Sequence, residues 1–410
     1  MIVLLCSILT GCKKEEIEPI TITVIHAWGS TEADHVAMRD IYQGFQDENP
    51  DVRLQLISMP TRDKMLKKVE DMIMVGDTPD IVCFSGMGQN RTYDFMVENN
   101  MALDLMPYLE SDPAFAESIS NTNLKYWVTE DNQLFSIADV LSLSGGYWYN
   151  EDILQKAGIT EIPSTWDEFL LMCEILSNWS KKQDAEMKSL QSSAEGYLYF
   201  ADHMLAENGG YTQKAIQNNQ MIIIDDEFDI IIKQLKEIYN FSTSESENYS
   251  YLDETSLFNE GKLAIYVNGV WGAPMIAGNI NAKYALLPTE SGNSMSCTST
   301  CLGYVLGNSE NEEKEEASVR FIKYMLSENI QTRILQETEQ IPANPHIDLS
   351  KFEIEKPRLY QAASLVLSAD RKIEVPDNLW IASKKNSFIG NIFKVLSGEL
   401  SDQDFEELLK

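Results

Sequence analysis

The hydrophobic pattern of the first third of the chain switches repeatedly between the period of a strand and that of a helix. Alternating β-branched residues or short buried-looking runs predict strands, and apolar residues spaced three or four apart predict helices. These signals predict strands at residues 20–25, 52–57 and 80–84 and helices at residues 35–45 and 64–75. Strands that alternate with helices in this way predict an α/β unit with a mostly parallel sheet.

Two loops of this unit are the first candidates for a ligand site. In a parallel sheet, the loops at the carboxyl ends of the strands hold ligands. Residues 28–31 follow the first predicted strand, and residues 84–87 follow the third. The pattern therefore points to these two loops before any particular chemistry is considered.

The rest of the chain continues the same mixture of elements. The pattern predicts a strand system at residues 141–150, strands at 263–268 and 283–287, and a helix opened by the acidic run 310–316. The polar stretch 180–193 is expected to lie exposed. At roughly 100–200 residues per domain, a chain of 410 residues predicts two or three domains.

Acidic residues outnumber basic residues two to one. The 64 Asp and Glu against 32 Lys and Arg give a formal net charge of −32 with the four histidines neutral. This charge argues against a nucleic-acid binder, which needs a basic face to neutralise phosphates. It also disfavours an anionic membrane surface or a polyanionic substrate as partner.

The N-terminus carries the pattern of an export signal. An apolar run too short to span a bilayer ends in small residues, and Leu9-Thr10-Gly11-Cys12 resembles the bacterial lipoprotein cleavage box. We therefore expect a signal peptide at residues 1–11, lipidation of Cys12 and a polar tether at residues 12–19. The alternatives are a signal that releases the protein or a frayed N-terminal strand.

Four cysteines lie beyond the lipoprotein box. The short spacing of Cys297 and Cys301 allows a disulfide that closes a small loop outside the cytoplasm. We expect Cys83 and Cys173 to be small buried hydrophobic residues, which is the usual fate of an unpaired cysteine.

Most catalytic and cofactor motifs are absent. The four histidines form no metal-ligand spacing, Gly261-Lys262 lacks the preceding glycine of a phosphate loop, and no nucleophile elbow follows a strand. We therefore predict no cofactor and no metal. Glycoside hydrolysis remains open because it needs only two carboxylates, for which Asp139 and Glu195 are the pair to test. The competing interpretation is that these acids are merely solvated or hydrogen bonded.

Several spaced segments together are similar to one family. They share the order and spacing of extracytoplasmic solute-binding proteins of ATP-driven importers, in the branch that includes maltose-binding proteins. The segments are Gly76-Asp77-Thr78-Pro79-Asp80-Ile81, Tyr149-Asn150 with Gly158 and Pro163-Ser164-Thr165-Trp166, Phe258-Asn259-Glu260-Gly261-Lys262 with Asn268-Gly269-Val270-Trp271, and 317–326 ahead of Ile341-Pro342-Ala343. The resemblance covers nearly all of residues 12–410.

The resemblance implies a two-lobed, periplasmic-binding-protein-like fold. Each lobe would be a mostly parallel sheet flanked by helices, and about three crossings would form a hinge between the lobes. Lobe one would comprise residues 20–138 and 272–324, and lobe two residues 139–271 and 325–410. A ligand would sit in the cleft, and closure of the lobes over it would signal the loaded state to the importer.

The same resemblance assigns cleft positions to several residues. Trp271 falls where the family places a sugar-stacking tryptophan, Trp380 lies near another, and Glu195 with Tyr197, ahead of Asn208-Gly209-Gly210, supplies an acid and an aromatic. The remaining expected ligand contacts are Trp28, Ser30, Phe84, Ser85 and Asp139. Independently of the family, a sugar needs flat apolar platforms for its C–H face and polar groups for its hydroxyls. The competing interpretation of each aromatic is core packing, which we prefer for Trp166.

The predicted function is therefore capture of a saccharide by a membrane-anchored, monomeric lipoprotein that delivers it to the permease subunits of an ABC importer. Such a protein would lie on the extracytoplasmic face of the bacterial cell membrane and perform no chemistry. The acidic field predicts a neutral mono- or oligosaccharide, because uronate-rich or phosphorylated sugars would be repelled. The alternatives are a secreted glycan-degrading enzyme that uses Asp139 and Glu195, and an adhesin.

Overall fold

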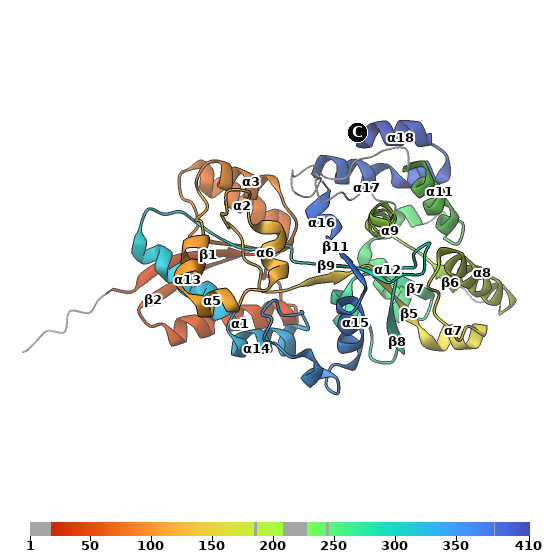
Figure 1. The fold of residues 1–410 in the computed structure, drawn as a ribbon, viewed down its shortest axis with the longest axis horizontal. Helices are drawn as coiled ribbons and strands as arrows, with labels where there is room; N and C mark the ends of the chain where they lie inside the picture. The colour runs from red at the N-terminus through yellow and green to blue at the C-terminus, as the bar shows by residue number, and fades with distance from the viewer. Residues whose placement is uncertain (1–17, 184–186, 208–227, 243–245, 381) are drawn as a thin grey trace, which may run out of the picture.

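The computed structural model describes residues 18–183, 187–207, 228–242, 246–380 and 382–410. The expected signal peptide, Cys12 and nearly all of the tether lie outside these residues, and so does Asn208-Gly209-Gly210. The described chain forms two lobes side by side (Figure 1). No helix in the described part of the chain is long and apolar enough to cross a membrane.

Lobe one is built on a four-stranded sheet with the strand order β10-β3-β1-β2. Strand β1 pairs in parallel with β2 and β3, and β10 is antiparallel to β3. The strands are β1 (Ile20–His26), β2 (Val52–Ser58), β3 (Ile81–Met87) and β10 (Leu302–Leu306). The helices are α1 (Ala33–Glu48), α2 (Arg62–Met74), α3 (Arg91–Glu98), α4 (Met106–Ser111), α5 (Pro113–Glu117), α6 (Asn121–Trp127), α13 (Glu312–Met325) and α14 (Glu328–Thr338).

Lobe two is built on a second four-stranded sheet with the order β6-β7-β5-β8. Only β6 and β7 are parallel, so this sheet is mixed where a mostly parallel one was expected. The strands are β5 (Gly146–Asn150), β6 (Lys188–Leu190), β7 (Leu263–Val267) and β8 (Ala282–Leu286). The helices are α7 (Glu151–Ala157), α8 (Trp166–Lys182), α9 (Ala194–Glu207), α11 (Phe228–Tyr239), α12 (Tyr251–Asn259), α15 (Pro357–Leu367), α16 (Pro376–Leu379), α17 (Ala382–Ser397) and α18 (Asp402–Leu409), with short 3₁₀ turns η1 (Ser246–Asn248), η2 (Val270–Met275) and η3 (Leu349–Phe352).

A three-stranded sheet with the order β11-β9-β4 lies near the junction of the lobes. Its strands are β4 (Ser142–Ser144), β9 (Met295–Ser299) and β11 (Arg371–Ile373). Gly145 separates β4 from β5 and so divides the strand system expected at residues 141–150. It has a φ of +87°, and a Cβ there would lie 2.7 Å from the backbone nitrogen of Cys297.

The division into lobes follows the hydrophobic cores. One core joins residues 22–137 with 302–334, while the remaining clusters join residues 143–301 with 335–409. The segment 272–324, expected in lobe one, is therefore split. Strands β8 and β9 pair with β5 and β4, and only the part from β10 onward packs in lobe one. The chain crosses between the cores near residues 138–142, 299–302 and 335–341.

Two local expectations differ from the structure. The stretch 180–193 is not generally exposed: Ser180 is buried, and Ser189, Gln191 and Ser193 are each at most 2 % exposed because β6 carries the segment into the lobe-two sheet. Cys297 and Cys301 form no disulfide. Like Cys83 and Cys173, they are free and buried.

The start of α8 shows how the sequence determines a helix boundary. The Thr165 hydroxyl accepts a hydrogen bond from the Glu168 backbone N–H, and the Glu168 carboxylate accepts one from the Thr165 backbone N–H. This reciprocal capping box satisfies two backbone donors at the helix start. It turns Trp166 into the core, where its ring stacks on Phe169 with ring centroids 5.8 Å apart.

Candidate functional site

A cavity of about 590 Å³ lies between the two lobes. Its lining comes from the loop after β1, the last part of strand β3, the first turns of α1 and α2, helices α9 and α12, the segment after β7, and all three crossings. Because both lobes and the crossings contribute, a change in the angle between the lobes would change the shape of this cleft. Of the nine expected ligand contacts, the cleft lining contains Trp28, Ser85, Glu195 and Trp271.

The lobe-one wall presents an aromatic ring held from several sides. The indole Nε1 of Trp28 donates to the Tyr42 hydroxyl at 3.2 Å, and the Trp28 backbone N–H donates to Nδ1 of His26 at 3.1 Å. The imidazole of His35 meets the indole edge-on, with ring centroids 5.1 Å apart. Arg39 donates to the carbonyl oxygens of Trp28 and Ser30. The loop after β1 is therefore a preorganised wall.

His26 supports this wall as a neutral acceptor. Burial lowers its pKa to about 4, with the Arg39 and His35 charges acting in the same direction. Its Nε2 lies 3.1 Å from the Ser58 hydroxyl. Because Nδ1 accepts the Trp28 N–H, the ring proton belongs on Nε2, so the Ser58 hydroxyl acts as the acceptor.

A side pocket of about 220 Å³ adjoins this wall. It shares Trp28, Arg62 and Ser85 with the main cleft. Arg62, in the first turn of α2, lies against Gly86, where an added Cβ would meet the guanidinium. Gly86 therefore leaves room for a cationic group at the edge of the cleft.

The lobe-two wall presents a pair of aromatic rings. Trp271, in η2, and Tyr199, in α9, both line the cleft and have ring centroids 6.1 Å apart at an interplanar angle of 50°. The Trp271 ring lies directly over Gly269, because a Cβ at that position would be 2.3 Å from it. Only a residue without a side chain permits this packing.

The turn beneath Trp271 is fixed by buried hydrogen bonds. The Gly269 carbonyl accepts a bond of 3.0 Å from the Trp148 indole, and its N–H donates to the Asn268 side-chain oxygen at 2.8 Å. The Tyr284 hydroxyl donates to the Asn268 carbonyl at 3.0 Å. The indole of Trp271 is thus held rigidly at the end of β7, which lowers the entropy lost when a ligand stacks on it.

Two carboxyl groups line the cleft from lobe two. Glu195, in the first turn of α9, is exposed, whereas Glu254 of α12 is only 1 % exposed. Burial raises the pKa of Glu254 well above its usual range, and the Glu195 charge adds to the effect. The buried Glu254 is therefore neutral at pH values where an ordinary glutamate is ionised.

Asp139 does not line the cleft. It lies at the first crossing and is 1 % exposed, and its Oδ2 accepts a hydrogen bond of 2.9 Å from the Tyr304 hydroxyl. Burial raises its pKa to about 6. Its backbone carbonyl accepts bonds from the Gln331 side chain and the Ala343 N–H, which flank the third crossing on either side. Asp139 therefore connects crossings, and the expected pair with Glu195 does not meet at the cleft surface.

A polar chain links this crossing to the lobe-one wall. The Tyr304 hydroxyl lies 3.0 Å from the Tyr42 hydroxyl, which in turn accepts the bond from the Trp28 indole. Asp139 is thus linked to the aromatic wall through two buried tyrosines and is not part of the cleft lining.

The other expected contacts lie behind the cleft surface. Phe84 is fully buried in the lobe-one core, although its neighbour Ser85 reaches the cleft. Ser30 does not line the cleft; its hydroxyl lies 2.9 Å from Nδ1 of His35. Trp380 is 2 % exposed, donates to Asp202 at 3.2 Å and packs edge-on against Phe388.

Tyr197 is displaced from the cleft by the phase of its helix. Its ring is fully buried and packs edge-on against Phe393, while its hydroxyl lies 3.2 Å from that of Ser242. Residues two apart on a helix point about 200° apart, so Tyr199 faces the cleft where Tyr197 faces the core. Tyr199 follows the exposed Glu195 by four residues and so lies on the same face of α9, and this spacing is the signal that could have identified it.

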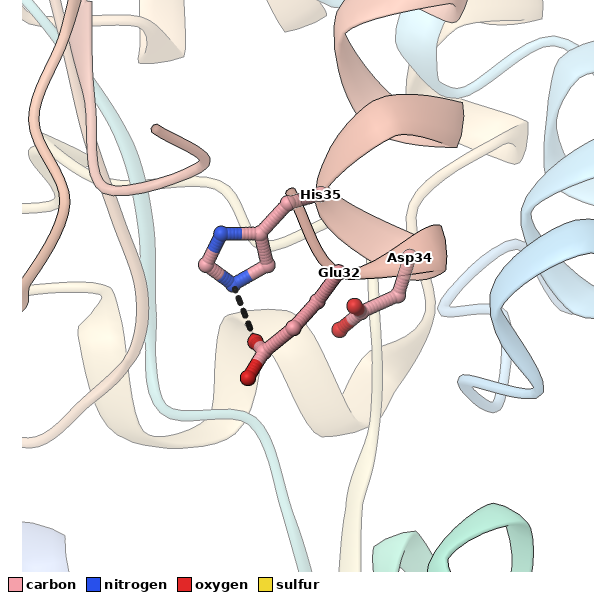
Figure 2. Close-up of side chains that lie close together, drawn as sticks. All are labelled: Glu32, Asp34 and His35. Atoms are coloured by element: carbon pink, nitrogen blue, oxygen red, sulfur yellow. Dashed lines mark ion pairs between the residues drawn. The ribbon is translucent and has the colours of Figure 1, made fainter. Parts of the chain in front are cut away.

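Three side chains at the rim form a small polar cluster. Glu32, Asp34 and His35 bring ligand-type atoms within 4.8 Å of one another (Figure 2). Nε2 of His35 lies 3.7 Å from Glu32, and Nδ1 accepts the Ser30 N–H at 3.2 Å. In the neutral ring that bond places the proton on Nε2, toward the acid. At 3.7 Å the His35–Glu32 contact is a polar contact that is too long for a hydrogen bond.

Comparisons with known proteins agree on one fold and one family. The family described as bacterial extracellular solute-binding protein matches residues 40–361. YcjN of Escherichia coli (strain K12), whose name is a provisional assignment as an ABC transporter periplasmic-binding protein, is 23 % identical over 337 residues, which cover 78 % of this chain and 72 % of that protein.

Solved structures are similar over almost the whole length. A Streptococcus pneumoniae solute-binding protein in complex with the blood group A-trisaccharide has a TM-score of 0.76 and 20 % identity, covering 95 % of this chain and 98 % of that one. A chitin oligosaccharide binding protein has a TM-score of 0.76 and 19 % identity, with coverages of 95 % and 96 %. At these identities the likeness establishes the two-lobed fold.

Proposed function

The chain belongs to the bacterial extracellular solute-binding proteins, and on this premise we propose that it captures a neutral mono- or oligosaccharide in its interlobe cleft and delivers it to an ABC importer. We further propose that Cys12 is lipidated and holds the monomeric protein at the extracytoplasmic face of the cell membrane. The protein performs no chemistry on its ligand.

The observation that carries the saccharide assignment is the pair of aromatic walls that face one cleft. Trp28 lines it from lobe one, and Trp271 with Tyr199 from lobe two. Aromatic rings pack against the apolar C–H face of a sugar, and nearby polar groups bind its hydroxyls. The volume of about 590 Å³ lies within the roughly 300–1,000 Å³ of pockets that enclose small molecules.

The charges of the cleft support a neutral ligand. Acids and bases both reach the lining, with Glu195 and Asp34 among the acids and Arg62 and Lys385 among the bases. Charged and neutral side chains alike form hydrogen bonds with hydroxyls, and those to charged groups are roughly twice as strong as neutral ones. Two solved proteins of this fold are described with oligosaccharides, the trisaccharide complex and the chitin oligosaccharide binder.

Titration of intrinsic tryptophan fluorescence with a panel of neutral and acidic sugars tests the proposal. Trp28 and Trp271 line the cleft, so a bound sugar should change the emission saturably. Tight binding of an acidic sugar in place of a neutral one would refute the charge preference. A panel without any saturable response would refute saccharide capture.

Analysis of the same mixtures by thin-layer chromatography tests the alternative of a glycan-degrading enzyme. Glu195 and the buried Glu254 face the same cleft, and burial raises the pKa of Glu254, as it does for the acid catalyst of many glycosidases. Sugar recovered intact supports capture, and turnover of the sugar would favour the enzyme.

A further inference from the structure

Glu254 is the most unusual polar group of the cleft. It is 1 % exposed, yet it belongs to the cleft lining. Hydrogen bonds from the backbone N–H and the hydroxyl of Ser193 reach its carboxyl group. Its Oε1 has no hydrogen-bond partner among the described residues.

An unpaired buried oxygen of this kind needs a physical explanation. Leaving a buried polar atom unsatisfied costs about 1–3 kcal/mol, and native proteins pair nearly all such atoms. An apolar side chain at this position, such as alanine or leucine, would avoid the cost. A carboxyl retained at the wall of a ligand cleft is explained if the ligand supplies the missing partner.

We propose that Oε1 of Glu254 is a ligand-binding atom, which donates a hydrogen bond to an oxygen of the captured saccharide and selects sugars that present an acceptor there. This assignment rests on the proposed saccharide-binding function. It makes Glu254 a specificity-determining residue distinct from the exposed Glu195.

The protonation of Glu254 determines the direction of this bond. Burial, together with the charges of Glu195 and Asp253, raises its pKa well above the usual range, so the group is neutral where ordinary glutamates are ionised. Because Oε1 has no hydrogen-bond partner among the described residues, we assign the proton of the neutral carboxyl group to Oε1. A neutral carboxyl can then donate to a hydroxyl or ring oxygen, which an ionised carboxylate cannot do.

Other titratable groups share the cavity and have to be separated in the test. Besides Glu195 of α9, the lining contains Asp34, His35 and Arg62 from lobe one, Glu339 from the third crossing and Lys385 from α17, while Asp253 of α12 acts on Glu254 from outside the lining. A variant that removes only the titration of Glu254 is therefore the matched comparison.

The test measures saccharide affinity of the wild-type protein, Glu254→Gln, Glu254→Ala and the exposed control Glu260→Gln. The Glu254→Gln variant keeps a donor in the place of Oε1–H and should bind the saccharide within about threefold of the wild-type affinity. The Glu254→Ala variant should bind it at least tenfold more weakly, a loss of about 1.4 kcal/mol in binding free energy. Glu260→Gln should bind as wild type does, because Glu260 lies exposed at the end of α12.

The pH profile supplies a readout that a merely structural role would not move. Wild-type affinity should be full below the pKa of Glu254 and fall as the pH rises through it, because ionisation removes the donor. The Glu254→Gln profile should lack this decline, while any pH dependence that arises elsewhere in the cleft is common to both proteins. This pair of profiles remains decisive even if Glu254→Ala does not fold.

Each contrary result has a separate meaning. Equal binding by wild type and a folded Glu254→Ala would overturn the assignment of Glu254 alone. Loss in Glu254→Gln as large as in Glu254→Ala, or identical pH profiles, would overturn the neutral donor. Wild-type protein that binds no saccharide would overturn the proposed function and this inference together.

Discussion

Replacement of Asp139 by Asn should stabilise the protein at neutral pH. The native carboxyl keeps its proton up to a pKa of about 6, whereas the ordinary value in an unfolded chain is 3.8. Between these values the native state binds more protons, so the unfolding free energy falls as the pH rises through this interval and stays lower above it. The difference corresponds to about 3 kcal/mol, at about 1.4 kcal/mol per pKa unit.

Asn keeps the acceptor for Tyr304 and removes the ionisation. Its amide NH2 would take the place of Oδ1, which has no hydrogen-bond partner among the described residues, and burying it costs about 1 kcal/mol. We therefore expect Asp139→Asn to be about 2 kcal/mol more stable than wild type at neutral pH and no more stable in acid.

Urea unfolding followed by circular dichroism at a series of pH values measures this difference. Buried histidines also titrate in the interval, so the quantity to plot is variant minus wild type at each pH, in which their contribution cancels. A difference that stays constant from acid to neutral pH would refute the reasoning, because it would show that Asp139 does not titrate between the two states.

Three further predictions concern stability and anchoring. As the pH falls from 6.5 to about 4, wild type should lose roughly 3 kcal/mol more stability than His203→Asn. Burial lowers the pKa of His203 to about 4, so the unfolded chain takes up the proton first. Equal slopes of unfolding free energy against pH, measured by urea unfolding, would contradict this. Gly145→Ala should cost on the order of 2 kcal/mol, because its φ of +87° and the contact with Cys297 exclude a Cβ, and an unchanged melting temperature would disprove the clash. Cys12→Ser should move the protein from the membrane fraction to the medium, and retention on the membrane would contradict the lipid anchor.

The local elements could be predicted from sequence because their signals are local. The strands expected at 20–25 and 52–57 begin where β1 and β2 begin, and the strand expected at 80–84 begins one residue before β3. The two-lobed α/β fold is confirmed. The position of Trp271 in the cleft lining could be expected because this residue follows a strand and a glycine on which its ring packs. These features depend on residues only a few positions apart.

The parts that sequence reasoning misplaced depend on contacts between distant residues. Residues 272–299 belong with lobe two because β8 and β9 pair with β5 and β4, more than 100 residues earlier in the chain. Tyr197 and Tyr199 differ only in helical phase, which the start of α9 determines. Glu254 gives no local signal, since its burial results from the packing of α12 near Ser193 at the start of α9.

Calorimetric titration of wild type and Trp271→Ala with the sugar that gives the largest fluorescence response tests the central claim most directly, because it needs no signal from the substituted tryptophan. We predict saturable binding of one saccharide per wild-type chain and at least tenfold weaker binding, about 1.4 kcal/mol, by a variant that remains folded. Equal affinities of the two proteins, or no binding heat from wild type, would show that the cleft between Trp28 and Trp271 is not a saccharide site.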